Sequence, residues 1–307
     1  MIEAEVGPRI AAWCRQELGA LPVGTVATPG LPQVNGTRLD DGRTVFIKAR
    51  PDPTRRTTTC VEVQQQVADA GFPCARPLTD ATYVDRYAVH AEEWRPGGEM
   101  LRGDSPAIAE RSAQLFADLT AITARIELTP PLPNPEWVHW DHTGPGIWPP
   151  NPRHDSRPGA DDLPGQLVDV AARARARLTK AEGRRVLGHA DWEAQNLRWS
   201  PDGIHTVYDW DSIAWLPEAA LVGAACGAFA STEIPTLAPL DSSEAFIAAY
   251  EEARRRRFTA DEREVAWAAS LWPAVHNARA EILWCQPAVA LAETLAQGEE
   301  RLRRARA

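Results

Sequence analysis

The sequence lacks several features that would assign it to large classes of protein. No apolar run approaches the roughly 20 residues that a membrane-spanning helix requires. The five cysteines form no CxxC pair, which indicates reduced thiols rather than a disulfide scaffold. The first residues show no secretory signal, and the net charge of −9 argues against a nucleic-acid binder. We therefore expect a cytoplasmic protein that has neither a membrane nor a nucleic acid as its partner.

The first third of the chain has the pattern of an antiparallel sheet with one helix. Two strand-like runs, 33–39 and 43–49, flank the turn signal Asp40-Asp41-Gly42. A helical pattern follows from about Thr58 to Ala70 and stops at Gly71. A further strand covers roughly residues 83–94. These elements predict a small β-rich lobe.

The strongest break in the chain is Arg95-Pro96-Gly97-Gly98. After it, helical spacing dominates, interrupted by an irregular loop rich in proline and tryptophan at 129–160. A total of 307 residues is enough for about two domains. We therefore predict an α+β protein with an N-terminal antiparallel-sheet lobe, 1–95, and a larger, mainly helical C-terminal lobe, 96–307.

One segment carries residues suited to phosphoryl transfer. Asp191 is followed five residues later by Asn196, and a predicted hairpin then leads to Asp209-Trp210-Asp211. An antiparallel hairpin returns the chain to its starting point, so it can bring these side chains together. In such a reaction one carboxylate accepts the proton of a hydroxyl, while an amide oxygen and a second carboxylate hold Mg²⁺ against nucleotide phosphates. An Asp followed by Asn is by itself a common turn, so only the combination is informative.

The combination resembles the aminoglycoside phosphotransferase and choline-kinase-like family, which has a two-lobed protein-kinase-like fold. The resembling segments are His189-Ala190-Asp191-x4-Asn196 and Asp209-Trp210-Asp211. The resemblance implies that Asp191 is the catalytic residue, supported by His189 within the same loop. It also implies that Asn196 and Asp209 bind Mg²⁺.

Segments upstream agree with this family in order and spacing. Lys48 ends a strand-like run, as the phosphate-binding lysine of the family does, and Glu62 lies in the next helix, where a lysine-pairing glutamate is expected. Glu92-Glu93-Trp94 resembles the hinge that contacts adenine. The resemblance therefore implies an ATP-dependent kinase, with GTP as an open alternative.

Acidic and aromatic residues suggest what the acceptor is. No Lys or Arg occurs between Trp199 and Tyr250, whereas acids are frequent there, and such a field attracts cations. We expect the acceptor to contact Asp211, Glu233, Glu281, Trp137 and Trp140. The ordinary alternatives are that the acids form a solvated face and that the tryptophans belong to the core.

With the resemblance, this favours an aminoglycoside or related aminocyclitol as the phosphorylated acceptor, which would serve antibiotic resistance or self-protection. The first alternative is a metabolic kinase for a sugar, an amino alcohol or another hydroxylated metabolite. A non-catalytic nucleotide-binding module is a third possibility. It is disfavoured because every residue that the chemistry needs is present.

Overall fold

The computed structural model describes residues 7–28, 31–128 and 132–307, and the chain divides into two compact units. Unit 1 comprises the chain up to Met100 together with Leu197–Asp211, and unit 2 comprises Leu101–Asn196 and Ser212–Ala307. The sequence-based boundary at residue 95 differs from this division, chiefly because the hairpin 197–211 groups with unit 1. Backbone hydrogen bonds explain the grouping: Val207 donates to Pro73 O at 2.9 Å, and Trp199 and Glu99 donate to each other's carbonyls at 2.8 Å.

Unit 1 is built on a five-stranded antiparallel sheet with the order β1-β2-β3-β5-β4. The predicted strand at 83–94 is in fact two strands, because Asp85 adopts a left-handed conformation (φ 55°) in a tight turn between them. The other predicted strands and the helix are confirmed. The strands are Pro22–Thr28 (β1), Leu31–Leu39 (β2), Thr44–Pro51 (β3), Thr82–Val84 (β4) and Tyr87–Glu93 (β5).

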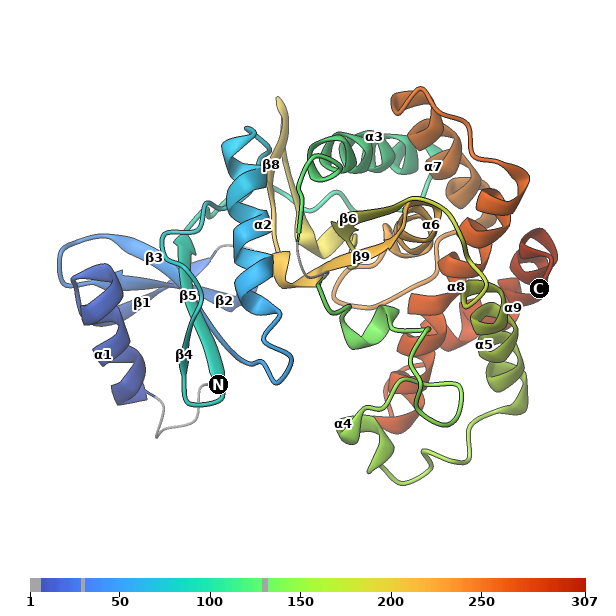
Figure 1. Cartoon of the computed structure of the whole chain (residues 1–307), viewed down its shortest axis with the longest axis horizontal. Helices are drawn as coiled ribbons and strands as arrows, with labels where there is room; N and C mark the ends of the chain where they lie inside the picture. The colour runs from blue at the N-terminus through green and yellow to red at the C-terminus, as the bar shows by residue number, and fades with distance from the viewer. Residues whose placement is uncertain (1–6, 29–30, 129–131) are drawn as a thin grey trace. The chain divides into compact units, whose positions relative to one another are not determined.

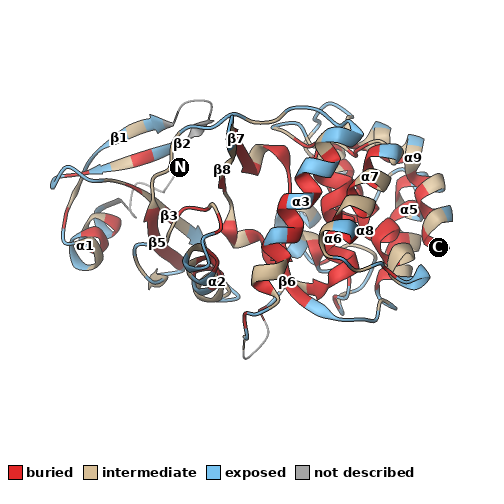
Figure 2. Cartoon of the chain, turned by 90° about the horizontal axis from the view of Figure 1, so that it is seen from above, coloured by how far each residue is buried: buried red, intermediate tan, exposed pale blue. Residues whose placement is uncertain are grey.

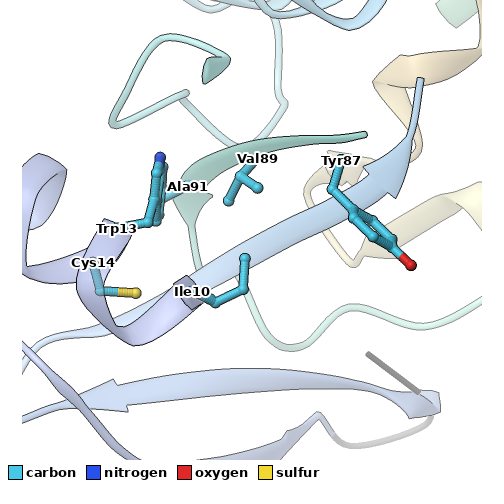
Figure 3. Packing of buried hydrophobic residues seen from close by; sticks show 6 residues of the cluster. All are labelled: Ile10, Trp13, Cys14, Tyr87, Val89 and Ala91. Carbon is cyan, nitrogen blue, oxygen red and sulfur yellow. The ribbon is translucent and has the colours of Figure 1, made fainter. Parts of the chain in front are cut away.

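Helices Gly7–Leu18 (α1) and Thr57–Asp69 (α2) accompany this sheet, and Figure 1 shows β5 between them. Ile10, Trp13 and Cys14 of α1 form a buried cluster with Tyr87, Val89 and Ala91 of β5 (Figure 3). Because side chains alternate along a strand, His90 and Glu92 belong to the opposite face of β5. That face carries the polar residues described below.

The hairpin of unit 1 consists of Leu197–Ser200 (β7) and Gly203–Val207 (β8). Tyr208, directly after it, donates its hydroxyl to Arg95 O at 2.6 Å, and Arg95 in turn donates to Cys74 O and His205 O. These bonds fasten the end of the hairpin, and hence the segment that follows it, to the rest of unit 1.

Unit 2 is mainly helical, which confirms the predicted α+β class. Gly223 and Gly227 allow two of its helices, α6 and α8, to approach closely, because a Cβ at either position would lie 2.2 Å from a carbonyl oxygen of α8. Figure 2 shows much of these two helices as buried. The helices are Pro106–Thr123 (α3), Pro152–Asp155 (α4), Gly165–Leu178 (α5), Glu218–Ala228 (α6), Leu240–Ala253 (α7), Ala260–Leu283 (α8) and Ala290–Ala305 (α9).

A two-stranded antiparallel ribbon, Arg185–His189 (β6) and Ile213–Pro217 (β9), crosses unit 2. The short 3-10 helices are Glu136–Val138 (η1), Ala194–Asn196 (η2) and Trp210–Ser212 (η3). Within the described residues, none of the helices is long and apolar enough to cross a membrane.

Candidate active site

Lys48 lies on β3 in a buried ion pair. Its Nζ is 3.2 Å from Glu92 Oε1, and the two side chains are only 8% and 3% exposed. Gln64 of α2 donates from Nε2 to Glu92 Oε2 and to Ala75 O, both at 2.7 Å. Burial acts to lower the pKa of Lys48, but the nearby carboxylates of Glu92, Asp211 and Asp209 raise it overall. The lysine is therefore a fixed positive charge.

Glu62, the expected partner of Lys48, is exposed on α2. The buried residues of this helix are Cys60, Val61, Val63, Gln64 and Val67, and Glu62 falls outside that stripe. Gln64 is the residue of α2 that reaches the pair, and Glu92 supplies the carboxylate. The pairing inferred from the resemblance is thus replaced by one between neighbouring strands. The sequence contained a signal for Gln64, since it lies on the apolar stripe.

The predicted hinge begins with Glu92 itself and continues through Glu93 and Trp94. The Glu93 N–H donates to Arg76 O at 2.8 Å, and the Glu93 carboxylate accepts the Arg76 N–H at 3.3 Å. The indole of Trp94 packs on β2, where a Cβ at Gly36 would lie 2.9 Å from Trp94 Nε1. The side chain of Glu92 therefore acts on Lys48, and contact of Glu93 and Trp94 with adenine stays a prediction.

The segment Asp209-Trp210-Asp211 follows the hairpin in a strained conformation. Asp209 has a positive φ of 60°, which is uncommon outside glycine and concentrates at functional sites. The intervening Trp210 is buried, donates from Nε1 to Val207 O at 2.9 Å, and meets the edge of Phe72. This anchored side chain fixes the positions of the two aspartates beside it.

Arg50 binds both of these aspartates. Its Nη2 lies 3.1 Å from Asp209 Oδ1, and its Nη1 donates to Asp211 Oδ2. Burial and the neighbouring Asp209 raise the pKa of Asp211. Asp211, expected to contact the acceptor, is thus engaged by Arg50 within unit 1. Arg50 was not among the predicted site residues, although alternation places it on the same face of β3 as Lys48.

In unit 2 the residues of the predicted catalytic loop form one hydrogen-bonded turn. Asn196 donates from Nδ2 to Asp191 O and to Asp191 Oδ2, both at 2.9 Å. The buried ring of His189 accepts the Asp191 N–H at Nδ1, at 3.3 Å, and packs against Trp192. Trp192 is itself buried and donates to Ser112 Oγ at 3.0 Å. His189 therefore supports the loop, while the Asp191 carboxylate is only partly buried.

Asn196 and Asp209 have the donor chemistry that Mg²⁺ prefers, which is hard oxygen in small number with phosphates and water completing the shell. The Asn196 amide gives its nitrogen to Asp191, so its oxygen is turned away from that carboxylate. Residues 7–28, 31–128 and 132–307 contain no cluster of three or more His, Cys, Asp or Glu that could hold a metal. The oxygens of Asn196 and Asp209 each suit a cation that is bound together with nucleotide phosphates.

The loop rich in proline and tryptophan is ordered by Arg175 of α5, and its residues 129–131 lie outside the described part. Arg175 donates to the carbonyls of Trp140, His142 and Gly146 at 2.7, 2.8 and 3.0 Å. Trp140 is buried and meets the edge of Trp272. The alternative that the tryptophans belong to the hydrophobic core therefore holds for Trp140. Trp137 is half-buried, and its contact with an acceptor stays a prediction.

The two predicted acceptor glutamates of unit 2 differ in their surroundings. Glu281 is buried, and its carboxylate accepts the backbone N–H groups of Val289, Ala290 and Leu291 at 3.2, 2.7 and 2.9 Å. It caps the start of α9, so the hydrogen-bonding capacity of its carboxylate is used to stabilise the fold. Glu233 is 60% exposed and pairs with Arg102 at 3.3 Å.

Two acids of the stretch without Lys or Arg, Glu218 and Glu244, pair with arginines that follow it, as does Glu251 directly after its end. Glu251 is completely buried between Arg257 and Arg263, at 3.1 and 2.7 Å. Glu244 also pairs with Arg263, at 2.9 Å. Buried Glu218 accepts the Tyr250 hydroxyl at 2.7 Å and lies 3.6 Å from the guanidinium of Arg254. The local negative field is consequently weaker than the sequence suggests.

Comparison with known proteins identifies the family of the chain. The model of the phosphotransferase enzyme family (APH) matches residues 37–256, well over half of the chain. The chain belongs to this family. It is accordingly a small-molecule kinase, as the resemblance implied. None of the curated proteins matches the chain significantly.

Solved structures share the fold of this kinase at low sequence identity. A microcompartment-associated aminopropanol kinase is 14% identical, with a TM-score of 0.64 over 97% of this chain and 98% of its own. An amicoumacin kinase in complex with AMP-PNP, Ca²⁺ and Ami is 10% identical, with a TM-score of 0.62 over 98% and 96%. A macrolide 2′-phosphotransferase from Brachybacterium faecium is 17% identical, with a TM-score of 0.52 over 94% and 97%. The predicted kinase-like fold is confirmed.

Proposed function

We propose that this kinase transfers the γ-phosphate of ATP, with Mg²⁺, to a hydroxyl group of a small molecule. The observation that carries the nucleotide part is the charge arrangement of unit 1. A lysine whose positive charge is fixed by Glu92 lies in the electrostatic range of Asp209, whose backbone has a positive φ and which precedes a buried tryptophan. A cation for phosphates and a hard ligand for a metal are therefore combined in one unit.

Each residue of unit 1 then has a definite task. Lys48 holds the α- and β-phosphates with its charged ammonium group. Glu92 keeps this group in place, because moving it away would leave a buried carboxylate without its ion-pair partner. Asp209 is the proposed metal ligand of unit 1, and Asn196 is the metal ligand that the resemblance assigns to unit 2. When bound, Mg²⁺ neutralises charge that develops on the phosphate oxygens. Glu93 and Trp94 contact the base, and ATP and GTP are compared directly to test which base is preferred.

Asp191 orients the acceptor hydroxyl and accepts its proton. The Asn196 amide, bonded to Oδ2, fixes the plane of the carboxylate, and His189 holds the backbone of the turn. General-base assistance of this kind contributes about 10²–10⁴-fold in rate, and orientation adds to it.

The acceptor class is supported less by charge than by the range of kinases that share the fold. Glu281 caps a helix, and Glu244 and Glu251 pair with arginines. Acids of this region that favoured an aminoglycoside are therefore engaged in contacts within the protein. Solved neighbours act, by their names, on an amino alcohol and on antibiotics. We place aminoglycosides and aminocyclitols beside sugars and amino alcohols as equal candidates. Nucleotide turnover with a panel of all four decides between them.

The mechanism is tested by the two aspartates, which we expect to fail differently. Asp191→Asn should bind Mg²⁺-nucleotide almost normally while losing kcat, since the carboxylate acts mainly in the transition state. Asp209→Asn should weaken Mg²⁺-dependent nucleotide binding as well as turnover, with partial recovery at high Mg²⁺. The measurement is calorimetric titration with a non-hydrolysable ATP analogue, with and without Mg²⁺, alongside steady-state rates. Reversed phenotypes would exchange the two roles, and full activity of both variants would refute the site.

A further inference from the structure

Arg50 is a charged residue of unit 1 that the proposed reaction does not yet use. It lies two residues beyond Lys48 on β3, so both side chains emerge from the same face of the sheet. Its guanidinium bridges Asp209 and Asp211. It therefore occupies the carboxylate that the proposed function assigns to the metal.

The ion pairs on this face, which join Lys48 to Glu92 and Arg50 to Asp209 and Asp211, differ in how readily they can open. Lys48 and Glu92 are 8% and 3% exposed, so separating them leaves a buried charge. The Arg50 side chain is 54% exposed and Asp209 is 27% exposed. Exposed pairs of this kind are weak, because water solvates both partners when they part. Arg50 can accordingly leave Asp209, whereas Lys48 stays with Glu92.

The guanidinium, 3.1 Å from Asp209 Oδ1, repels a divalent cation that approaches the same carboxylate, so the two cations compete for it. We propose that Arg50 is a positioning residue, an internal counter-ion of the loop Asp209–Asp211 that a divalent cation must displace. The proposal rests on the proposed function, since it takes Asp209 as a metal ligand. Metal alone then binds weakly, because it has to replace an existing partner. Metal that arrives with a nucleotide binds better, because the released Arg50 remains on the face of Lys48, where phosphates can pair with it.

The direct test is the affinity of the nucleotide-free protein for Mn²⁺, followed by electron paramagnetic resonance of the unbound ion. Arg50→Ala should bind Mn²⁺ about three- to tenfold more tightly than the unsubstituted protein, as expected for loss of a modest competing ion pair. Arg50→Lys should lie between the two, because a single ammonium cannot bridge both carboxylates as a planar guanidinium does. Nucleotide affinity in the presence of Mn²⁺ should fall in Arg50→Ala, in the opposite direction.

Arg43→Ala is the matched control. Arg43 pairs with Asp41 at 2.6 Å and is 48% exposed, so this substitution removes the same charge and frees a carboxylate in the same unit. It should leave the Mn²⁺ affinity unchanged. Circular dichroism melting of each variant checks that the fold is retained, and Arg50→Lys preserves the test if the alanine variant unfolds.

The outcomes separate this inference from the proposed function. If Arg50→Ala binds Mn²⁺ as the unsubstituted protein does, or more weakly, while Asp209→Asn abolishes Mn²⁺-dependent nucleotide binding, the counter-ion role of Arg50 is refuted and the metal site stands. If the gain of Arg50→Ala persists in the double variant with Asp209→Asn, Asp209 is not the ligand and the proposed function loses its metal site. Loss of the gain in that double variant supports both.

Discussion

Replacing Glu92 by Gln should destabilise unit 1 far more than the same replacement of Glu62. Lys48 Nζ lies 3.2 Å from Glu92 Oε1, and at an effective dielectric constant of about 20 this attraction is about 5 kcal/mol. Asp211 and Asp209 also attract Lys48, so part of the stabilisation survives the substitution. Breaking a buried ion pair typically costs about 3–5 kcal/mol. We therefore expect Glu92→Gln to lower the free energy of unfolding by about 3 kcal/mol.

Glu62→Gln is the matched control, because it makes the same chemical change on the exposed face of α2. Substitutions of this kind usually change the free energy of unfolding by less than about 0.5 kcal/mol. Urea denaturation followed by circular dichroism measures the stability of both variants. Hydrogen exchange at the amides of β3 and β5 checks that the loss lies in unit 1.

Equal stability of the two variants would refute the reasoning, since it would mean that Glu92 does not stabilise buried Lys48. A second outcome would restore the pairing inferred from the family resemblance. If Glu62→Gln raised the KM for ATP while Glu92→Gln did not, Glu62 would hold the lysine in the nucleotide-bound enzyme. We expect the reverse, with the KM raised by Glu92→Gln alone.

Two further predictions concern unit 2. Glu281→Ala should lower the free energy of unfolding by about 1–2 kcal/mol, because it removes the cap of α9. Thermal unfolding and steady-state kinetics check this. A raised acceptor KM at unchanged stability would instead show that Glu281 belongs to the acceptor site. Burial, with His154 and Arg279 nearby, lowers the pKa of His276 from 6.5 to about 4, so the unfolded chain takes up this proton at a higher pH than the folded one. Stability should therefore fall by about 3 kcal/mol between pH 6.5 and pH 4, and urea titrations of His276→Gln should show a flatter pH dependence unless another group is responsible.

The elements of unit 1 could be predicted well because their signals are local. Asp40-Asp41-Gly42 marks a turn, and the helix near Thr58 ends at a glycine, so no distant residue has to be known. The single strand expected at 83–94 was wrong because Asp85 replaces glycine at a left-handed turn position. The grouping of the hairpin 197–211 with unit 1 depends on hydrogen bonds to residues about one hundred positions away. No local pattern records such contacts.

In the candidate site, too, local motifs could be predicted from the sequence, whereas contacts between distant residues could not. Motif spacing and the family resemblance made Lys48, Asp191, Asn196 and Asp209 candidate residues, because a motif is a local pattern, and their roles stay predictions. The partners of charged residues are set by packing, and here prediction was less successful. Glu281 was expected to bind an acceptor, but its carboxylate meets the first turn of α9. Charge counting also treats each acid as exposed, whereas Glu218 is buried beside Arg254, which lies outside the counted window.

Because Glu92 of β5 pairs with Lys48 in place of Glu62 of α2, the position of the lysine depends on the sheet and not on the helix. A glutamate on a helix can leave its lysine when the helix shifts, so such a pair can respond to regulation. Glu92 is on β5, which is hydrogen-bonded to β3 through a continuous register from Val45 to Pro51. Lys48 and its partner therefore move together, and α2 contributes only the neutral Gln64. The responsive cation on this face is then Arg50, whose exposed pair with Asp209 can open while Lys48 remains in place.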